Sequence, residues 1–93
     1  MSVTLVVTPS AARDVADAYA DHSSHGQGDA FIAAVDRVFT QIADSPRMFP
    51  VTYANVHRAL LRRFPYSAFF ILEPDQAVIL ALHHQRRDPA ARP

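Results

Sequence analysis

The side chains best suited to chemistry in this sequence are arginines and histidines, and they gather in its second half. Arg58 and Arg62 fall in one segment, and His83-His84-Gln85-Arg86-Arg87 fall in another. If the two segments are neighbouring strands, Arg58 and the Arg86/Arg87 pair converge into a guanidinium cluster that suits phosphates or a partner's carboxylates. The alternative is that each Arg is solvated at a sheet rim, with Asp88 pairing one of them.

Other kinds of site find little support in the sequence. His22 and His25 have metal-ligand spacing, but His25 falls in an expected loop, and the adjacent His83 and His84 point to opposite faces of a strand. Tetrahedral metal sites need three or four converging ligands, so we expect no metal. Cysteine is absent and there are only 2 glycines, which excludes a thiolate nucleophile and a Gly-rich phosphate loop. The spacing shows no Ser-His-Asp arrangement, and we expect no cofactor.

The length and charge of the chain limit which kinds of domain and surface can carry these residues. Its 93 residues suit one domain, 1–93, whose residues 84–93 form a C-terminal tail. The net charge is zero, yet residues 1–46 hold two Arg against six Asp, whereas residues 47–93 hold seven Arg against three acids. This asymmetry indicates a basic working surface, although a solvated basic face fits the composition equally well. No segment reads as a secretory signal or a membrane span, so we expect a cytoplasmic protein with no membrane partner.

The hydrophobic pattern predicts an α+β domain with the order βααβββ. Val3–Thr8 is β-branched and predicts a strand, and Thr8 or Ser10 can cap the helix that follows and ends before Gly26. A second helix runs from near Gly28 to Asp44, and the short polar loop between the two helices predicts an antiparallel hairpin. Pro46–Asn55 is expected to be irregular. Three strands are predicted after it: His57–Phe64, Tyr66–Leu72 and Ala77–His83. They complete a four-stranded, mainly antiparallel sheet with the helical hairpin on one face.

Two of these strands are apolar on both alternating sets of positions. Tyr66–Leu72 is almost entirely apolar, and every residue of Ala77–Leu82 is apolar. A strand that is apolar on both faces should be covered on both faces, but one pair of helices covers only one. Either the sheet curls around a second small core or a partner protein covers the other face, and we favour the partner.

The order of several short motifs resembles the RelE/ParE superfamily, the toxins of type II toxin–antitoxin modules, and in particular its ParE-like branch of plasmid stabilisation proteins. The matching features cover nearly the whole chain. They are Ala12 and Asp14, Gly28, Pro46, Arg58 opening the second strand, Phe64-Pro65-Tyr66 at a corner, the aromatic pair Phe69-Phe70, and His84, Arg87, Asp88 and Pro89 after the last strand.

The resemblance implies a growth-inhibiting toxin neutralised by a cognate antitoxin that wraps its sheet and helices, in a toxin–antitoxin hetero-oligomer. The residues expected to bind the antitoxin are Phe69, Phe70, Ile71, Val78 and Leu80. Those expected to bind the cellular target are Arg58, Arg62, Tyr66, His84, Arg86 and Arg87.

The superfamily splits by mechanism, and the sequence favours one branch. RelE-like members cleave messenger RNA on the ribosome, which here would use Arg58, His84 and Arg87, whereas ParE-like members are not enzymes and inhibit DNA gyrase. Ser67 and Ala68 stand where the ribonuclease branch carries a basic residue, and Phe70 stands where many relatives have Tyr. Zero net charge also argues against an RNA-binding enzyme. We therefore expect gyrase inhibition, with ribosome-dependent mRNA cleavage, or a non-toxic binding module derived from this fold, as the alternatives.

Overall fold

A computed structural model describes residues 2–87 of the chain and confirms the α+β class. Asp88 and Pro89 of the expected C-terminal motif, with the side chain of Arg87, lie outside this part. The elements follow in the order β1 (Thr4–Val7), α1 (Pro9–Ser23), α2 (Gly28–Asp44), the 3-10 helix η1 (Pro46–Met48), β2 (Val51–Tyr53), β3 (Val56–Leu60), β4 (Tyr66–Leu72), β5 (Gln76–His84) and the 3-10 helix η2 (Gln85–Arg87). Within residues 2–87 no helix has the length and apolar character needed to span a membrane.

The sheet has five strands rather than the expected four, in the order β1-β5-β4-β3-β2. The additional strand, β2, lies in the segment Pro46–Asn55 that was expected to be irregular. It pairs with β3 across the two-residue connection Ala54-Asn55, where Ala54 takes a φ of 50°. A three-residue edge strand that directly follows Pro50 is too short to show a period of two, which is why the sequence pattern missed it.

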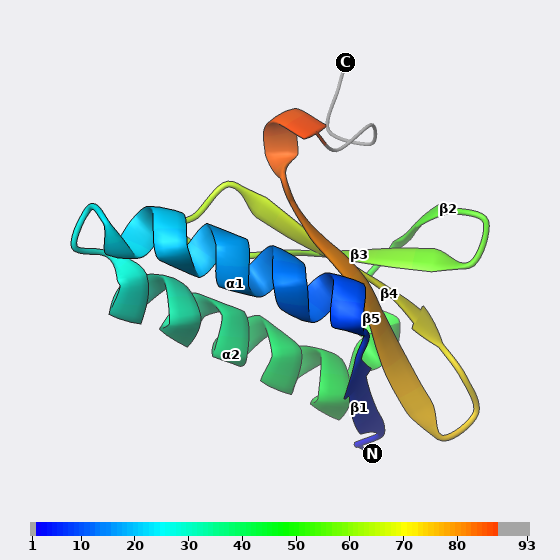
Figure 1. The fold of residues 1–93 in the computed structure, drawn as a ribbon. Coiled ribbons are helices and arrows are strands. Elements are labelled where there is room, and N and C mark those ends of the chain that lie inside the picture. Colours follow the sequence, from blue (N-terminus) through cyan, green and yellow to red (C-terminus); the bar gives the residue numbers. More distant parts are fainter. Residues whose placement is uncertain (1, 88–93) are drawn as a thin grey trace.

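Strand β1 pairs with β5, and helix α1 packs against β5 beyond the end of that pairing. β1 runs parallel to β5 only from Thr4 opposite Gln76 to Val7 opposite Ile79. Beyond that point α1 lies along β5 (Figure 1), and the hydroxyl of Thr8 donates to the carbonyl of Leu80 at 3.4 Å. The sheet edge that β1 leaves open is therefore closed by a helix, which removes a site for unwanted strand pairing.

The two helices form the predicted antiparallel hairpin, and each begins as its sequence indicates. Thr8 caps α1 by accepting the backbone N–H of Ala11 at 3.1 Å, with Pro9 at the first helical position. Gly26 takes a φ of +73° in the connection, a conformation that glycine adopts without strain. At Gly28 an added Cβ would lie 3.0 Å from Tyr19 Cε1 and from Ser23 Cβ, so the absence of a side chain lets the two helices approach closely.

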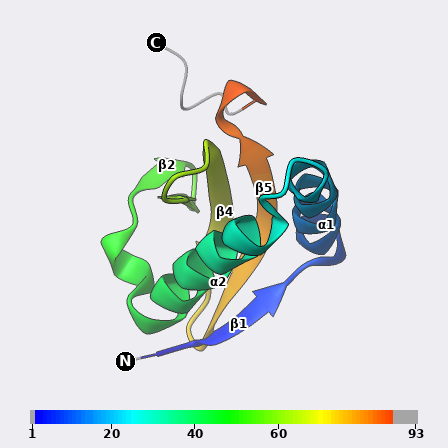
Figure 2. The ribbon, with the colours of Figure 1, turned by 90° about the vertical axis from the view of Figure 1, so that its left-hand side faces the viewer.

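One buried cluster lies between the helices and one face of the sheet. In Figure 2, α2 lies in front of the central strands and α1 lies beside β5. The largest fully buried apolar side chains are Phe31 and Ile42 from α2, Phe70 from β4 and Ile79 from β5. Because the described residues form one core cluster, the alternative of a second small core within a curled sheet is not supported.

Strand β3 ends at Leu60, four residues before the predicted Phe64. The chain then turns a corner in which Arg63 takes a φ of 73° and the carbonyl of Phe64 accepts the N–H of Tyr66 at 2.8 Å. The predicted strand His57–Phe64 is therefore too long at its end, and Arg62 and Phe64 do not lie in a strand with Arg58. Arg62 is exposed in the corner, whereas Phe64 is buried with the helices.

Candidate functional site

The two faces of the sheet differ in what covers them. The face toward the helices carries Tyr66, Ala68, Phe70, Ala77, Ile79 and Leu82, all of them buried. We call the opposite side the outer face. Its residues on β3, β4 and β5 are Val56, Arg58, Leu60, Ser67, Phe69, Ile71, Val78, Ala81 and His83, as the strand registers and the alternation of side chains require.

The outer face presents an apolar strip that no described helix covers. Phe69, Ile71 and Val78 are each half-buried, although they lie at the centre of the sheet. Leu60, at the end of β3, is 50% exposed. An uncovered apolar surface of this kind on a small domain marks a protein–protein contact.

One of the five expected antitoxin contacts does not belong to this surface. Phe70 is 0% exposed and stacks on the ring of His57 at 4.9 Å on the helix side, so it is removed from the set. Leu80 has no partner on β4, because Phe69 pairs with Ala81 and Phe70 with Ile79, which makes Leu80 the extra residue of a β-bulge. Ala81 therefore pairs with Phe69 on the outer face, and Leu80 lies beside it in the bulge, half-buried.

Arg58 and His84, which a ribonuclease would use together, lie on opposite faces of the sheet. Arg58 pairs with Phe69 on the outer face, whereas His84 pairs with Tyr66 and its ring contacts the Tyr66 ring, 5.2 Å between centroids, on the helix side. Two strand spacings and three residues along β5 separate them, which places their Cα atoms about 14 Å apart. The opposite orientation of His83 and His84, which the sequence predicted, agrees with this register.

One ring nitrogen of His84 accepts a hydrogen bond from the backbone. Its Nδ1 accepts the backbone N–H of Arg86 at 3.1 Å, so in the neutral ring the proton lies on Nε2. A general base needs a free lone pair on a ring nitrogen, and in this arrangement the lone pair of Nδ1 is already used. His84 is therefore poorly placed to abstract a proton.

Three of the expected target-binding residues line one hollow between α1 and the end of β5. Tyr66, His84 and Arg86 lie on one side of a space of about 530 Å³, with His83 beside them. Asp14, Asp17 and Asp21 of α1 form the opposite wall. Neither Arg58 nor Arg62 lines this space, so the six expected target residues do not make a single basic surface.

Two polar residues of the outer face were not predicted as site residues. Ser67 is 0% exposed, and its hydroxyl has no hydrogen-bond partner. His83 pairs directly opposite Ser67, and its Nε2 lies 3.9 Å from Asp14 Oδ2. Alternation along β4 and β5 could have placed Ser67 and His83 on one face of the sheet. Their pairing could not be predicted, because the bulge at Leu80 shifts the register between the two strands and its position does not follow from composition.

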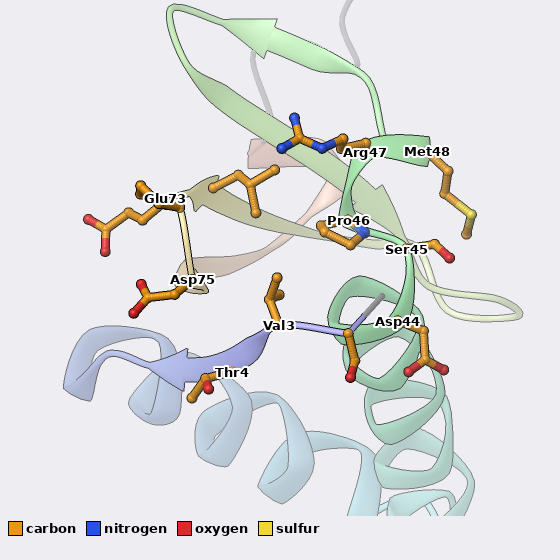
Figure 3. Close-up of a pocket in the computed structure, with 12 residues that line it drawn as sticks. Val3, Thr4, Asp44, Ser45, Pro46, Arg47, Met48, Glu73 and Asp75 are labelled. Atoms are coloured by element: carbon orange, nitrogen blue, oxygen red, sulfur yellow. The ribbon is translucent and has the colours of Figure 1, made fainter.

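A second hollow lies at the other end of the sheet (Figure 3). It measures about 660 Å³ and lies between the start of β1, the end of α2 and the turn that joins β4 to β5. Glu73 and Asp75 lie on one side of it, and Ser45 and Arg47 on the other. None of the predicted site residues lines it. Within residues 2–87, no group of three or more His, Asp or Glu side chains could hold a metal ion.

Comparisons with known proteins agree on one kind of protein. Residues 5–89 match the family model described as the ParE toxin of the type II toxin–antitoxin system parDE. Among solved structures, a chain of the chromosomal ParDE toxin–antitoxin system from P. aeruginosa aligns with a TM-score of 0.75 at 18% identity, covering 89% of this chain and 96% of that one. A chain of the toxin–antitoxin complex RelBE2 from Mycobacterium tuberculosis aligns with a TM-score of 0.63 at 21% identity, covering 90% and 99%. No curated protein was found to match the chain.

Proposed function

Because the chain belongs to the ParE toxin family of type II toxin–antitoxin systems, we propose that it stops cell growth by inhibiting DNA gyrase and is neutralised by a cognate antitoxin. Gyrase acts in the cytoplasm, so the proposal places the toxin there, in a hetero-oligomer with its antitoxin until it is released. On this proposal the chain acts by binding and not by catalysis.

The separation of Arg58 from His84 is the observation that carries the choice of gyrase over the ribosome. Cleavage of RNA needs a base to activate the 2′-hydroxyl and a cation to stabilise the phosphate, both within reach of the same nucleotide. Here the two groups lie on opposite faces of the sheet, and Nδ1 of His84 is occupied by the Arg86 N–H. A binding surface does not need such convergence.

Ribosome-dependent mRNA cleavage is the second candidate, and one observation favours it. His83 and Arg58 share the outer face, and Asp14 lies near Nε2 of His83. If the chain is a ribonuclease, His83 therefore replaces His84 as the candidate base.

The uncovered outer face supports the antitoxin part of the proposal. Phe69, Ile71 and Val78 remain half-exposed in the isolated chain, and both structural neighbours were solved as toxin–antitoxin systems or complexes. We propose that a segment of the antitoxin covers this strip.

Two assays on the purified chain separate the candidates. A gyrase inhibitor should impair supercoiling of relaxed plasmid in vitro, and induced cells should show DNA damage and filamentation while bulk mRNA stays intact. A ribonuclease should instead cut transcripts in a reconstituted translation system, and His83→Ala should abolish the cutting. A chain that binds its antitoxin but does neither, and does not slow growth, is a non-toxic binding module.

A further inference from the structure

Five apolar side chains form a line across the outer face, one from each strand of the sheet. Residues that pair directly on neighbouring strands share a face, so the strand registers fix this line from β1 to β2. In the order of the strands its members are Val6, Val78, Ile71, Val56 and Tyr53. None of the five is buried, and Tyr53 is 77% exposed. We call this line the apolar row.

The apolar surface is longer across the strands than along them. Neighbouring strands lie about 4.8 Å apart, so the four spacings of the row span about 19 Å. Phe69 and Ala81 form a second apolar line beside the row, about 7 Å from it, but the outward residue of β3 in that line is Arg58. The outward residues after these are Ser67 and His83. The apolar band is therefore about as wide as one α-helix, which measures about 10–12 Å with its side chains.

A helix that lies across the strands matches the spacing of the row. Helical residues on one face recur every three or four positions, which is about 4.5–6 Å along the axis. Five residues at i, i+3, i+7, i+10 and i+13 therefore cover about 20 Å, close to the length of the row. Their direction rotates in a left-handed sense along the axis, as the strands of a twisted sheet do. An extended segment repeats its face only every 6.6–6.8 Å or so, and three of its residues span the row.

The size and charge of the outer face favour a helix over a second copy of this chain. The apolar band covers about 200 Å², whereas a stable interface between two folded chains takes about 800 Å² from each. The strand residues of the outer face include basic side chains and no acidic one. Two copies would therefore oppose like charges, whereas a helix with acidic residues beside its apolar stripe is complementary.

We propose that the apolar row binds one amphipathic α-helix of the cognate antitoxin, which lies across the strands and sets one apolar residue against each strand in turn. The inference rests on the proposed function, since it specifies the conformation and direction of the antitoxin segment on the outer face. The helix needs about four turns to reach from Val6 to Tyr53. Its binding covers Tyr53, the most exposed member of the row.

Disulfide mapping measures the conformation of the bound segment. The chain contains no cysteine, so Val6→Cys and Tyr53→Cys each place a single thiol at one end of the row. Each variant is mixed with antitoxin variants that carry one cysteine at successive positions. We expect the antitoxin positions that react with the two ends to lie about 13 residues apart, because a helix rises 1.5 Å or so per residue. A separation of about 6 residues would mean an extended segment, and reaction at only one end would mean that no single segment covers the row; either result overturns the inference.

The affinity of the purified chain for its purified antitoxin tests the contact at Tyr53. We expect Tyr53→Ala to weaken binding about tenfold, as truncation of a large aromatic side chain in an interface commonly does. Val51→Ala is the matched control, because Val51 lies on the same strand and is 53% exposed but pairs with His57 on the helix side. It should bind like the wild-type chain. Equal affinity of Tyr53→Ala and the wild type would overturn the inference.

Two further readouts separate the possible failures. Because Tyr53 is 77% exposed, Tyr53→Ala should unfold at the same denaturant midpoint as the wild type, so weaker binding does not come from a damaged fold. A disulfide-linked dimer between Val6→Cys and Tyr53→Cys chains without antitoxin would make the row an interface between copies, which contradicts the inference. If the antitoxin fails to bind even the wild-type chain, it is the proposed function that fails.

Discussion

The carboxylate of Asp14, on α1, accepts the backbone N–H of Leu82, on β5, at 3.0 Å. This contact joins the first helix to the last strand at a point that β1 does not reach. An aspartate in the first half of α1 thus acts in place of a missing strand, and it keeps the N–H of Leu82 from being buried without a partner.

We expect Asp14→Ala to destabilise the fold by about 1–3 kcal/mol, because it leaves the N–H of Leu82 unpaired. Asp14→Asn should lose less, since the amide oxygen still accepts a hydrogen bond. Denaturant melts of the purified variants provide the measurement. Asp17→Ala, an exposed aspartate on the same helix, is the control, and equal midpoints for the variants at 14 and 17 would contradict the role given to Asp14.

Gly28→Ala should also destabilise the chain, by about 1–3 kcal/mol, although Ala normally stabilises a helix relative to Gly. The reason is the distance of 3.0 Å from the new Cβ to Tyr19 Cε1 and Ser23 Cβ. Thermal melts of Gly28→Ala should show a lower midpoint, and part of the loss should be recovered when Tyr19→Ala is added. A raised midpoint in the single variant would show that the two helices have room to separate.

His22 should tolerate replacement by an apolar ring. Its ring stacks on Phe31 at 4.8 Å between centroids, but its Nε2 is buried without a hydrogen-bond partner. His22→Phe should therefore keep or raise the free energy of unfolding, by about 1 kcal/mol at most, because it retains the ring and removes an unpaired polar atom. His22→Ala should destabilise the chain by about 2–4 kcal/mol through the cavity it leaves. If His22→Phe and His22→Ala lower the free energy of unfolding equally, Nε2 of His22 must have a hydrogen-bond partner in solution.

The arginines proposed for the target contact should matter for toxicity more than for folding. Arg58→Ala and Arg86→Ala should strongly reduce growth inhibition after induction, while the unfolding free energy changes by about 0–1 kcal/mol, as expected for surface charges. Replacement by Lys should restore toxicity only in part, because Lys keeps the charge but loses the planar fork. Arg37→Ala, on α2, is the control and should remain fully toxic. If Arg58→Ala and Arg86→Ala are both fully toxic, these two arginines do not contact the target.

The local structure was readable from the sequence where a residue type has one strong role. Thr8-Pro9 predicted the start of α1, the second helix was predicted from near Gly28 to Asp44 as α2 runs, and the run Tyr66–Leu72 matches β4 residue for residue. The end of β3 could not be predicted, because Arg63 takes a positive φ that is unusual for arginine. The prediction that the candidate site residues converge was wrong for a related reason. Strand register and the bulge at Leu80 decide which side chains share a face, and neither follows from local propensity.

The parallel pairing of β1 with β5 also has a consequence in time. Thr4 finds its partner, Gln76, only after the intervening segments have been made, since β5 follows the other described strands. Contacts so far apart in sequence form slowly, and the early segments keep their apolar surface exposed until the last strand arrives. A chain built this way completes its native sheet only after β5 has been made. An antitoxin that is already present therefore has the interval between translation and folding in which to meet the nascent toxin before its activity is assembled.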